Sequence, residues 1–341
     1  MPDPNPGEAR QAIVPASISV ALCTFNGEKY LAAQLDSIIG QTLPPTEIVI
    51  SDDGSTDGTL AIIASYVARS TESARGIQIR ALEPIGRQGV VANFDRAIAA
   101  CSGSFIALCD QDDVWVDDKL ARLTSFFQAH PECLLAHTDA LLVDSQGQSL
   151  GHTLLSALRV TAADKARIHS GGAQALLLRH NFVTGATVMF KRELFSRVRP
   201  FPPGWIHDEW LAIAAAVTCG IDLLDEPLVL YRQHGSNEIG AQKLTLRILG
   251  TRFFGSRRDR NQRLLLRSQS LFDRVQRWEP ALPVEILDAC AQKLEHERVR
   301  SALPVSRTLR FRPILRELST GRYGSFGNGL GDALRDGLQS A

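Results

Sequence analysis

The sequence lacks the patterns that mark several common classes of protein. Its six cysteines (23, 101, 109, 133, 219 and 290) form no CxxC pair, which argues against a zinc site or a disulfide framework. No apolar run approaches the roughly 18 residues that a membrane-spanning helix requires. The first residues have neither the basic start nor the apolar core of a secretory signal. We therefore expect a cytoplasmic protein with reduced core cysteines and a flexible lead-in over residues 1–16.

Three common enzyme motifs are also absent. No GxGxxG follows the first predicted strand, which weakens a dinucleotide-binding interpretation. No GxxxxGK[ST] occurs, which argues against a P-loop NTPase, and no GxSxG occurs, which argues against an α/β-hydrolase. The function must therefore be sought in other clusters of polar residues.

The residues that are present predict an α/β protein. Hydrophobic residues make up 44% of the chain and charged residues 22%, values typical of a globular protein. Strand-like and helix-like patterns alternate in the first part of the chain, which favours a mostly parallel sheet flanked by helices. The predicted strands are residues 18–23, 47–51, 76–82, 104–109, 134–137, 140–143, 186–190 and 228–231. The predicted helices are residues 28–39, 57–69, 88–100, 119–127 and 209–217.

Carboxylates follow two of these strands. Asp110, Asp112 and Asp113 come directly after strand 104–109, and a pair of aspartates follows strand 47–51. Because parallel strands end at one rim of a sheet, the two loops are expected to lie close together. So many like charges need a cation or hydrogen-bond donors, and Mg²⁺ or Mn²⁺ binds such groups together with phosphate oxygens. For this stretch alone, a solvated acidic loop is an equally good interpretation.

Several ordered motifs resemble those of the family 2 inverting glycosyltransferases of GT-A fold. They are residues 21–26 (ALCTFN), 52–57 (DDGSTD), 89–95 (GVVANFD) and 110–113 (DQDD). The DQDDxW form followed by Lys119 is similar to the bacterial rhamnosyltransferase-like branch. The resemblance implies a nucleotide-sugar-binding GT-A catalytic domain over residues 17–240, followed by a basic, helical carboxyl-terminal extension over residues 241–341.

The resemblance also implies roles for the donor side of a site. Residues 24–26, which follow the first strand (the first loop), would meet the nucleotide. The carboxylates of residues 52–57, which follow the second strand (the second loop), would bind its base or ribose. The implied nucleotide-binding residues are Thr24, Phe25, Asn26, Asp52, Asp53 and Asp110. The implied ligands of a Mn²⁺ or Mg²⁺ ion are Asp110, Asp112 and His234. Asp113 and Trp115 are expected to serve structure instead, in loop capping and in core packing.

An inverting transferase needs a general base for the acceptor hydroxyl. The segment 205–210 (WIHDEW) matches the place where the family carries an acidic pair at the start of a helix, and Asp208 is the implied base. We expect His207 or Glu209 to orient it, and the helix N-terminus to keep it ionised. Thr184 and Gly185 match an element beside the pocket for the sugar and the acceptor.

The carboxyl-terminal region is strongly basic. Residues 241–341 contain 19 basic and 10 acidic residues, although the whole chain has a net charge of zero. A basic amphipathic helix there could lie on an anionic membrane, or it could pack on the catalytic domain. Nucleic-acid binding is not expected, since no recognisable module or stacking pattern occurs. The arginines concerned are Arg247, Arg252, Arg257, Arg258, Arg260 and Arg263.

The leading hypothesis is a metal-dependent inverting glycosyltransferase. It would move a sugar, with L-rhamnose as the candidate, from a dTDP- or UDP-linked donor to a saccharide or lipid-linked acceptor. This transfer would be a step in cell-surface polysaccharide synthesis, and it would take place in the cytoplasm or on the inner face of the membrane. Two alternatives stay open: a sugar nucleotidyltransferase, although the basic Gly-rich loop it needs is not visible, and a non-catalytic nucleotide-sugar-binding or scaffold protein.

Overall fold

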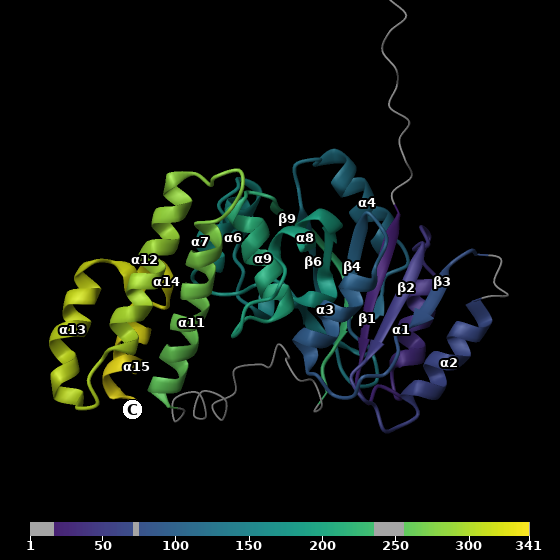
Figure 1. Cartoon of the computed structure of the whole chain (residues 1–341), viewed down its shortest axis with the longest axis horizontal. Helices are drawn as coiled ribbons and strands as arrows, with labels where there is room; N and C mark the ends of the chain where they lie inside the picture. The colour runs from purple at the N-terminus through teal and green to yellow at the C-terminus, as the bar shows by residue number, and fades with distance from the viewer. Residues whose placement is uncertain (1–16, 71–74, 235–255, 341) are drawn as a thin grey trace, which may run out of the picture.

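A single mixed sheet forms the centre of the protein. The computed structural model describes residues 17–70, 75–234 and 256–340, and the described strands join in the order β3-β2-β1-β4-β8-β6-β9-β5, with β7 paired to β6. Figure 1 shows the sheet between two groups of helices. The strands are β1 (Ile18–Thr24), β2 (Glu47–Asp52), β3 (Gln78–Ala81), β4 (Phe105–Cys109), β5 (Val114–Trp115), β6 (Leu135–Val143), β7 (Ser149–Thr153), β8 (Val188–Lys191) and β9 (Ile221–Arg232).

The direction of pairing changes at β4. Strands β3, β2, β1 and β4 are mutually parallel, and Ala21 of β1 lies between Val49 of β2 and Leu108 of β4. Strand β8 is antiparallel to both β4 and β6, whereas β6 and β9 are parallel. The predicted parallel sheet is therefore confirmed for the first four strands, and antiparallel pairs join it to the rest.

Both faces of the sheet are covered by helices. Along β1, Ala21 and Cys23 face a core built with α3 and α9, whereas Val20 and Leu22 face a core built with α1, α2 and α4. Burial on both faces explains why the strands read as continuous apolar runs. The helices of this part are α1 (Leu31–Ile39), α2 (Thr59–Ser70), α3 (Val90–Ala100), α4 (Lys119–Ala129), α5 (Leu154–Ala157), α6 (Ala162–His169), α7 (Ala173–Leu177), the 3-10 turn η1 (Gly185–Thr187), α8 (Arg192–Val198) and α9 (His207–Val217).

One sequence prediction of strand structure was wrong. The expected strands 134–137 and 140–143 are a single strand, β6. The polar pair between them does not break the strand, because Asp139 is buried and its Oδ1 accepts hydrogen bonds from the backbone N–H groups of Ala140 (2.8 Å) and Leu155 (2.9 Å). The register with β9 shifts at this point instead. The short strands β5 and β7 were not predicted.

The carboxyl-terminal extension is helical and packs on the α/β part of the protein. It contains α11 (Arg257–Val275), α12 (Val284–Ser301), α13 (Arg307–Ser319), α14 (Arg322–Phe326) and α15 (Leu330–Leu338). Leu271 and Val275 of α11 and Ile286 and Cys290 of α12 belong to the same hydrophobic core as α9. The described α11 and α12 therefore pack on the rest of the protein, as one of the two interpretations of the basic region predicts.

The arginines of that region have different environments. Arg257 is buried and donates to the carbonyl of Leu303 at 3.1 Å, and Arg260 forms an ion pair with Asp336. These two guanidinium groups are thus used inside the protein. Arg247 and Arg252 lie outside the described residues. None of the helices in the described part of the chain is long and apolar enough to span a membrane.

All six cysteines are free thiols. Five are buried, as the sequence predicted, and burial raises the pKa of the Cys101 and Cys133 thiols to about 12. Cys219, in the turn between α9 and β9, is exposed and does not fit that prediction.

Candidate active site

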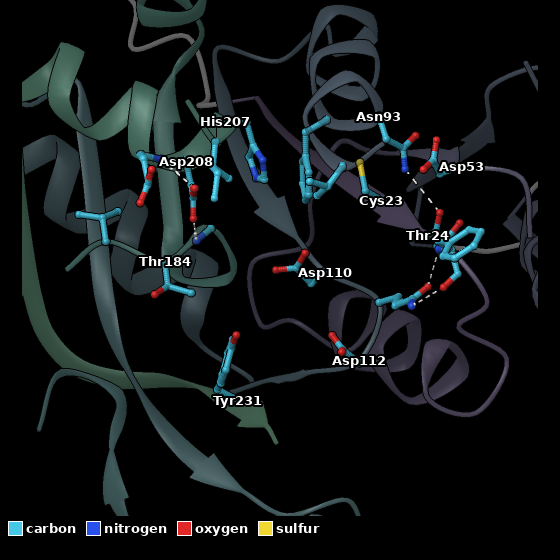
Figure 2. A pocket seen from close by; sticks show the side chains of 18 of the residues that line it. Cys23, Thr24, Asp53, Asn93, Asp110, Asp112, Thr184, His207, Asp208 and Tyr231 are labelled. Atoms are coloured by element: carbon cyan, nitrogen blue, oxygen red, sulfur yellow. Dashed lines mark hydrogen bonds between the residues drawn. The ribbon is translucent and has the colours of Figure 1, made fainter. Parts of the chain in front are cut away.

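A pocket with a volume of about 270 Å³ opens where β1, β2 and β4 end. Figure 2 shows Asp110 and Asp112 between Thr24 and Asp53 on one side and Thr184 and Asp208 on the other. Ten of the predicted site residues line it, and Asn26, Asp52 and His234 do not. The lining residues are Cys23, Thr24, Phe25, Asp53, Val90, Asn93, Phe94, Asp110, Gln111, Asp112, Leu158, Asn181, Val183, Thr184, Gly185, Ile206, His207, Asp208, Glu209 and Tyr231.

Asp52 organises the loop that follows β2. Its Oδ2 accepts from the hydroxyl of Thr24 at 2.6 Å, and its Oδ1 accepts from the backbone N–H groups of Gly54 (3.0 Å) and Ser55 (2.7 Å). These side-chain hydrogen bonds to nearby backbone groups fix the conformation of the loop. The structure therefore gives Asp52 a supporting position behind the pocket wall.

Asp53 lines the pocket and connects it to the start of α3. Its Oδ1 accepts from the backbone N–H of Gln88 at 2.5 Å, and its Oδ2 accepts from that of Gly89 at 3.0 Å. Asp53 thus presents a fixed acceptor at the edge of the pocket.

The first loop is held by a residue that the sequence analysis missed. Gln111 accepts from the backbone N–H of Phe25 at 2.8 Å and donates to the Phe25 carbonyl at 2.9 Å. Asn26 has a positive φ of 49° and its Oδ1 accepts from the Thr56 N–H, so it fastens this loop to the second one. The sequence alone suggests no role for Gln111 between the aspartates of the DQDD motif. Nothing in the neighbouring residues predicts its contact with Phe25.

Negative charge accumulates in the middle of the pocket. Burial, together with the charges of Asp112 and Asp208, raises the pKa of Asp110 from 3.8 to about 7. Asp112 forms a hydrogen bond with His234, in which Oδ2 of the carboxylate lies 2.8 Å from Nε2 of the ring. Asp113 is fully within the protein, where its Oδ1 accepts from the Arg232 N–H at 2.9 Å. That contact is the loop-supporting position expected for Asp113.

Lys119 has no exposed surface and lies beneath residues 110–113, the loop that follows β4 (the acidic loop). Its Nζ lies 3.7 Å from the centroid of the Trp115 ring and donates to the carbonyl of Ala186 at 2.8 Å. Burial lowers the pKa of this amine to about 7, although Asp113 and Asp110 oppose the shift. Lys119 therefore links the acidic loop to the turn at Gly185, and Trp115 is a core residue as predicted.

Asp208 lies at the start of α9 on the far side of the pocket. Its Oδ2 accepts from the backbone N–H of Gly185 at 2.8 Å, and its Oδ1 accepts from that of Glu209 at 2.7 Å. Burial raises the pKa of Asp208 even though these donors lower it. The N–H groups at the helix N-terminus favour the ionised carboxylate as expected, but desolvation has the larger effect on its pKa.

His207 does not orient Asp208. Its ring stacks on Phe94 with centroids 3.8 Å apart, and neither ring nitrogen has a hydrogen-bond partner among the described residues. Burial lowers the pKa of His207 to about 3, so the imidazole is neutral. The backbone N–H groups of Gly185 and Glu209 orient Asp208, and His207 instead presents a neutral polar group to the pocket.

Glu209 connects the pocket to the carboxyl-terminal helices. Its carboxylate forms an ion pair with Arg267 of α11, with 2.7 Å between Oε2 and Nη2. The Arg267 guanidinium also stacks on Trp205, 4.2 Å from the ring centroid. The indole N–H of Trp205 donates to the hydroxyl of Ser270 at 3.0 Å. The segment that carries Asp208 is thus fastened to α11.

The family model described as glycosyl transferase family 2 matches residues 19–199, which is more than half of the chain. The chain belongs to this family. The match includes both acidic loops and the Gly185 turn. It ends before Asp208, so the assignment of the base does not follow from it.

Two relatives are similar in sequence to this family member. An uncharacterized protein of Mycobacterium tuberculosis is 30% identical over 224 residues, 64% of this chain and 59% of that protein. An uncharacterized glycosyltransferase of Nostoc sp. is 28% identical, over 64% of this chain and 66% of its own length. The chain thus spans about three fifths to two thirds of these relatives.

Solved structures share the GT-A fold of this family member. The Staphylococcus aureus TarS fragment in complex with UDP-GlcNAc has a TM-score of 0.55 and 16% identity, covering 89% of this chain and 81% of that one. The mannosyltransferase PcManGT of Pyrobaculum calidifontis, in complex with GDP-Man and Mn²⁺, has a TM-score of 0.50 and 18% identity, covering 94% and 78%. The predicted fold class, a GT-A fold with a helical extension, is therefore confirmed.

The residues present fit a divalent metal when a donor supplies part of its coordination. Among the described residues, no group of three or more His, Cys, Asp and Glu side chains is arranged as a metal site. Mg²⁺ and Mn²⁺, however, are commonly held by one or two carboxylates together with substrate phosphates. Asp112 and its neighbour His234 offer such a pair, and the raised pKa of Asp110 marks negative charge that a cation would offset.

Proposed function

We propose that this protein is a metal-dependent inverting glycosyltransferase that uses a nucleoside-diphosphate sugar. The observation that carries the proposal is the convergence of Asp53, Asp112 and Asp208 on one pocket. They come from the ends of β2 and β4 and from the start of α9. In this arrangement Asp53 would bind the nucleotide, Asp112 would lie at the diphosphate and Asp208 would lie at the acceptor.

The donor half follows from the first two loops. The nucleotide would lie along Thr24 and Phe25, with Asp53 accepting from an N–H of the base. Arg87 stacks on the Phe25 ring, 4.2 Å from its centroid, which gives this edge a positive charge beside an aromatic face. Asp110 would meet the ribose.

The metal would be held by Asp112 with Asp110 and His234. When bound, Mn²⁺ or Mg²⁺ neutralises the negative charge that develops on the nucleoside diphosphate as it leaves. The Mn²⁺ and GDP-Man in the PcManGT structure support this choice of partner. The residues of this chain position the acidic loop, through the contacts of Gln111 and Lys119.

Asp208 would act as the general base. The acceptor hydroxyl gives its proton to the Asp208 carboxylate while its oxygen attacks the anomeric carbon, and the nucleoside diphosphate departs from the opposite face. A single displacement of this kind inverts the anomeric centre. Burial raises the pKa of Asp208, which makes its carboxylate a stronger base.

The sugar and the acceptor form the finer part of the proposal. Val90, Phe94, Val183 and Ile206 give the inner wall an apolar character, which supports a sugar with an apolar edge such as L-rhamnose from a dTDP- or UDP-linked donor. A saccharide or lipid-linked acceptor of a surface polysaccharide is supported by two relatives. These are a putative teichuronic acid biosynthesis glycosyltransferase of Bacillus subtilis and TarS, a poly(ribitol-phosphate) β-N-acetylglucosaminyltransferase.

Thermal shift with nucleoside diphosphates tests the proposal first. We expect UDP or dTDP to raise the Tm in the presence of Mn²⁺ and to have a weaker effect with EDTA, because a ligand of the folded state stabilises it by mass action. Failure of every nucleotide to shift the Tm would contradict the whole assignment. Release of pyrophosphate from a nucleoside triphosphate and a sugar phosphate would favour the nucleotidyltransferase.

The variant Asp208→Asn separates catalysis from binding. We expect it to abolish sugar transfer and to keep the Mn²⁺-dependent Tm shift, since the amide retains the hydrogen bond from Gly185 but cannot take a proton. NMR of the product anomeric centre reports inversion. Transfer at the wild-type rate would show that Asp208 is not the base, and a wild type that binds donors but never transfers would favour the scaffold protein.

A further inference from the structure

Helices α13 and α15 have their polarity reversed relative to an ordinary amphipathic helix. On α15, Leu330, Leu334 and Leu338 follow one another at a spacing of four residues, yet they are 54% to 70% exposed. On the same helix Asp336 has no exposed surface. In a water-soluble bundle such an apolar stripe is expected to face the core. Here the stripe faces outward.

Helix α13 shows the same reversal. Its buried residues are Ile314 and the charged Arg310 and Glu317, whereas Leu309, Phe311 and Leu315 are 49% to 66% exposed. The exposure is concentrated as well. Of the twelve large apolar side chains that are exposed in the described part of the chain, seven lie between residues 305 and 338.

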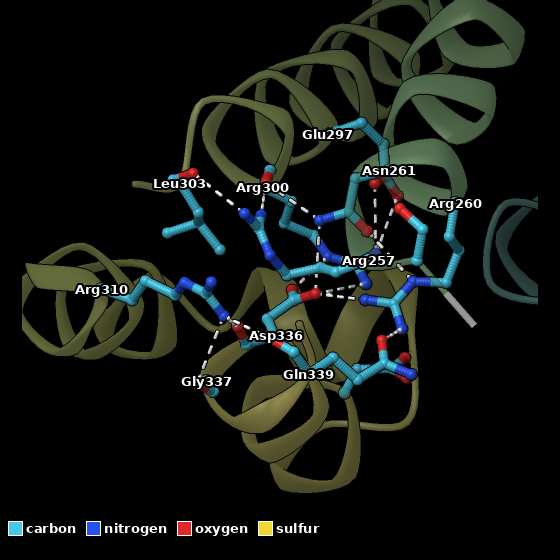
Figure 3. A network of polar contacts seen from close by, with 12 residues as sticks. Arg257, Arg260, Asn261, Glu297, Arg300, Leu303, Arg310, Asp336, Gly337 and Gln339 are labelled. Atoms are coloured by element: carbon cyan, nitrogen blue, oxygen red, sulfur yellow. Dashed lines mark hydrogen bonds and ion pairs between the residues drawn. The ribbon is translucent and has the colours of Figure 1, made fainter. Parts of the chain in front are cut away.

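The inward faces carry a dense polar network (Figure 3) beside a small apolar cluster that includes Ile314 and Ala333. Asp336 receives hydrogen bonds from the guanidinium of Arg300 at 2.7 Å and from the hydroxyl of Tyr323 at 3.0 Å, and it pairs with Arg260. Arg310 of α13 donates to the carbonyls of Asp336 (3.1 Å) and Gln339 (2.7 Å) at the end of α15. These bonds fix α13 and α15 to each other and to α12 with their leucines outside.

The outward surface is also positively charged. Arg307, Arg312 and Arg316 of α13 are exposed, and none of them forms an ion pair with another described residue. The acidic residues of the two helices offset little of this charge, because Glu317 and Asp336 are buried and Asp332 is half-buried. The surface therefore combines large apolar side chains with guanidinium groups.

We propose that this α13–α15 outer surface docks on an anionic lipid membrane. Its members are Leu309, Phe311, Leu315, Leu330, Leu334 and Leu338 together with Arg307, Arg312 and Arg316. The apolar side chains enter the boundary between head groups and acyl chains, and the arginines contact the lipid phosphates. The surface lies at the end of the molecule opposite β2 and β3 (Figure 1), so docking leaves the first two loops uncovered.

Charge distinguishes this occupant from a second copy of the chain. In a two-fold symmetric dimer the same surface meets itself, which would bring the unpaired arginines of one copy close to those of the other. Like charges at short range oppose such contact. Anionic head groups complement them, and their attraction weakens with salt.

Co-sedimentation of the full chain with vesicles tests the proposal. We expect binding to vesicles of equal parts phosphatidylcholine and phosphatidylglycerol, little binding to phosphatidylcholine alone, and loss of binding at high salt. The triple variant L330S/L334S/L338S should bind about tenfold less, as should R307Q/R312Q/R316Q. The matched controls are L60S/I85S, which removes exposed apolar side chains elsewhere, and R258Q/R277Q, which removes exposed arginines from α11 and the turn after it.

A second measurement needs no variant. Hydrogen exchange of the wild type should slow in residues 305–319 and 330–338 when the anionic vesicles are added, and should not change in α1. Equal sedimentation with both vesicle types, a folded leucine variant that still binds, or unchanged exchange in these segments would overturn the proposal. A dimer in sedimentation velocity that the leucine variant loses would identify the surface as a self-association interface instead.

Discussion

Gln111 binds the main chain of Phe25 at both of its hydrogen-bonding groups, with its Oε1 2.8 Å from the N–H nitrogen and its Nε2 2.9 Å from the carbonyl oxygen. Gln111 lies between Asp110 and Asp112, so one side chain joins the first loop to the acidic loop. The nucleotide and the metal would therefore bind to two loops that move together.

Replacement of Gln111 tests this coupling. Gln111→Ala removes two hydrogen bonds worth about 0.5–1.5 kcal/mol each, and we expect nucleoside diphosphate with Mn²⁺ to bind about tenfold more weakly. Isothermal titration calorimetry measures the change. Gln148→Ala, in an exposed turn, is the control and should bind like the wild type. An unchanged affinity of Gln111→Ala would show that the loops are positioned independently.

Asp110 sets a conflict between stability and function. Burial and the charges of Asp112 and Asp208 raise its pKa from 3.8 to about 7, so the folded protein favours the protonated carboxyl. Its contribution to stability is fully present below the unfolded pKa and is lost as the pH rises towards 7. Without metal, Asp110→Asn should therefore stabilise the protein at about pH 8, on the order of 1–3 kcal/mol after relaxation of the site.

Urea unfolding in EDTA across this pH range measures the effect on the free energy of unfolding. The difference between Asp110→Asn and the wild type should grow as the pH rises from about 4 to about 8. Asp117→Asn, at an exposed position in the next turn, should show no such growth. A difference that is constant with pH would mean that Asp110 titrates normally in the folded chain.

The pair of Asp112 and His234 should control metal-dependent binding. We expect Asp112→Asn to weaken Mn²⁺-dependent nucleotide binding by about 10–100-fold, and His234→Ala to weaken it less, because a partner of a ligand contributes less than the ligand. Binding measured in EDTA should differ little between either variant and the wild type. His152→Ala, at a half-buried histidine outside the pocket lining, is the control. Equal Mn²⁺ dependence in all four proteins would exclude this pair as the metal site.

The carboxyl-terminal helices should contribute to activity through Arg267. Arg267→Met breaks the 2.7 Å ion pair and leaves the half-buried Glu209 carboxylate without its partner, at a cost of about 1–3 kcal/mol. We expect kcat for transfer to fall about tenfold, while donor binding, measured as the Mn²⁺-dependent Tm shift, is kept. Arg263→Met, on the exposed side of α11, should retain kcat. Equal activity of the two variants would separate the extension from the site.

The donor half of the site could be predicted because it follows from local patterns. An apolar run ends, polar residues follow, and parallel strands bring such ends to one rim. Thr24, Asp53, Asp110 and Asp112 were placed together by that rule. The finer roles stay predictions, because the geometry shows where a side chain lies and not what it binds.

The missed features depend on contacts between distant segments. The partner of Gln111 lies 86 residues away, and that of Glu209 lies on α11. The outward leucines of α15 have the spacing of a core-facing stripe. Periodicity therefore predicts an amphipathic helix correctly, but it predicts that the leucine face is buried when it is exposed. Only the network around Asp336 decides the direction.

The change of strand direction at β4 has a consequence for the synthesis of the protein. Strand β4 gains its second neighbour, β8, only after β5, β6 and β7 have left the ribosome. Until then the apolar segment Phe105–Cys109 presents an open edge on which another chain can add a strand. Nascent chains that stall between β4 and β8 should therefore aggregate or require a chaperone, and a fragment that ends before β8 should be insoluble.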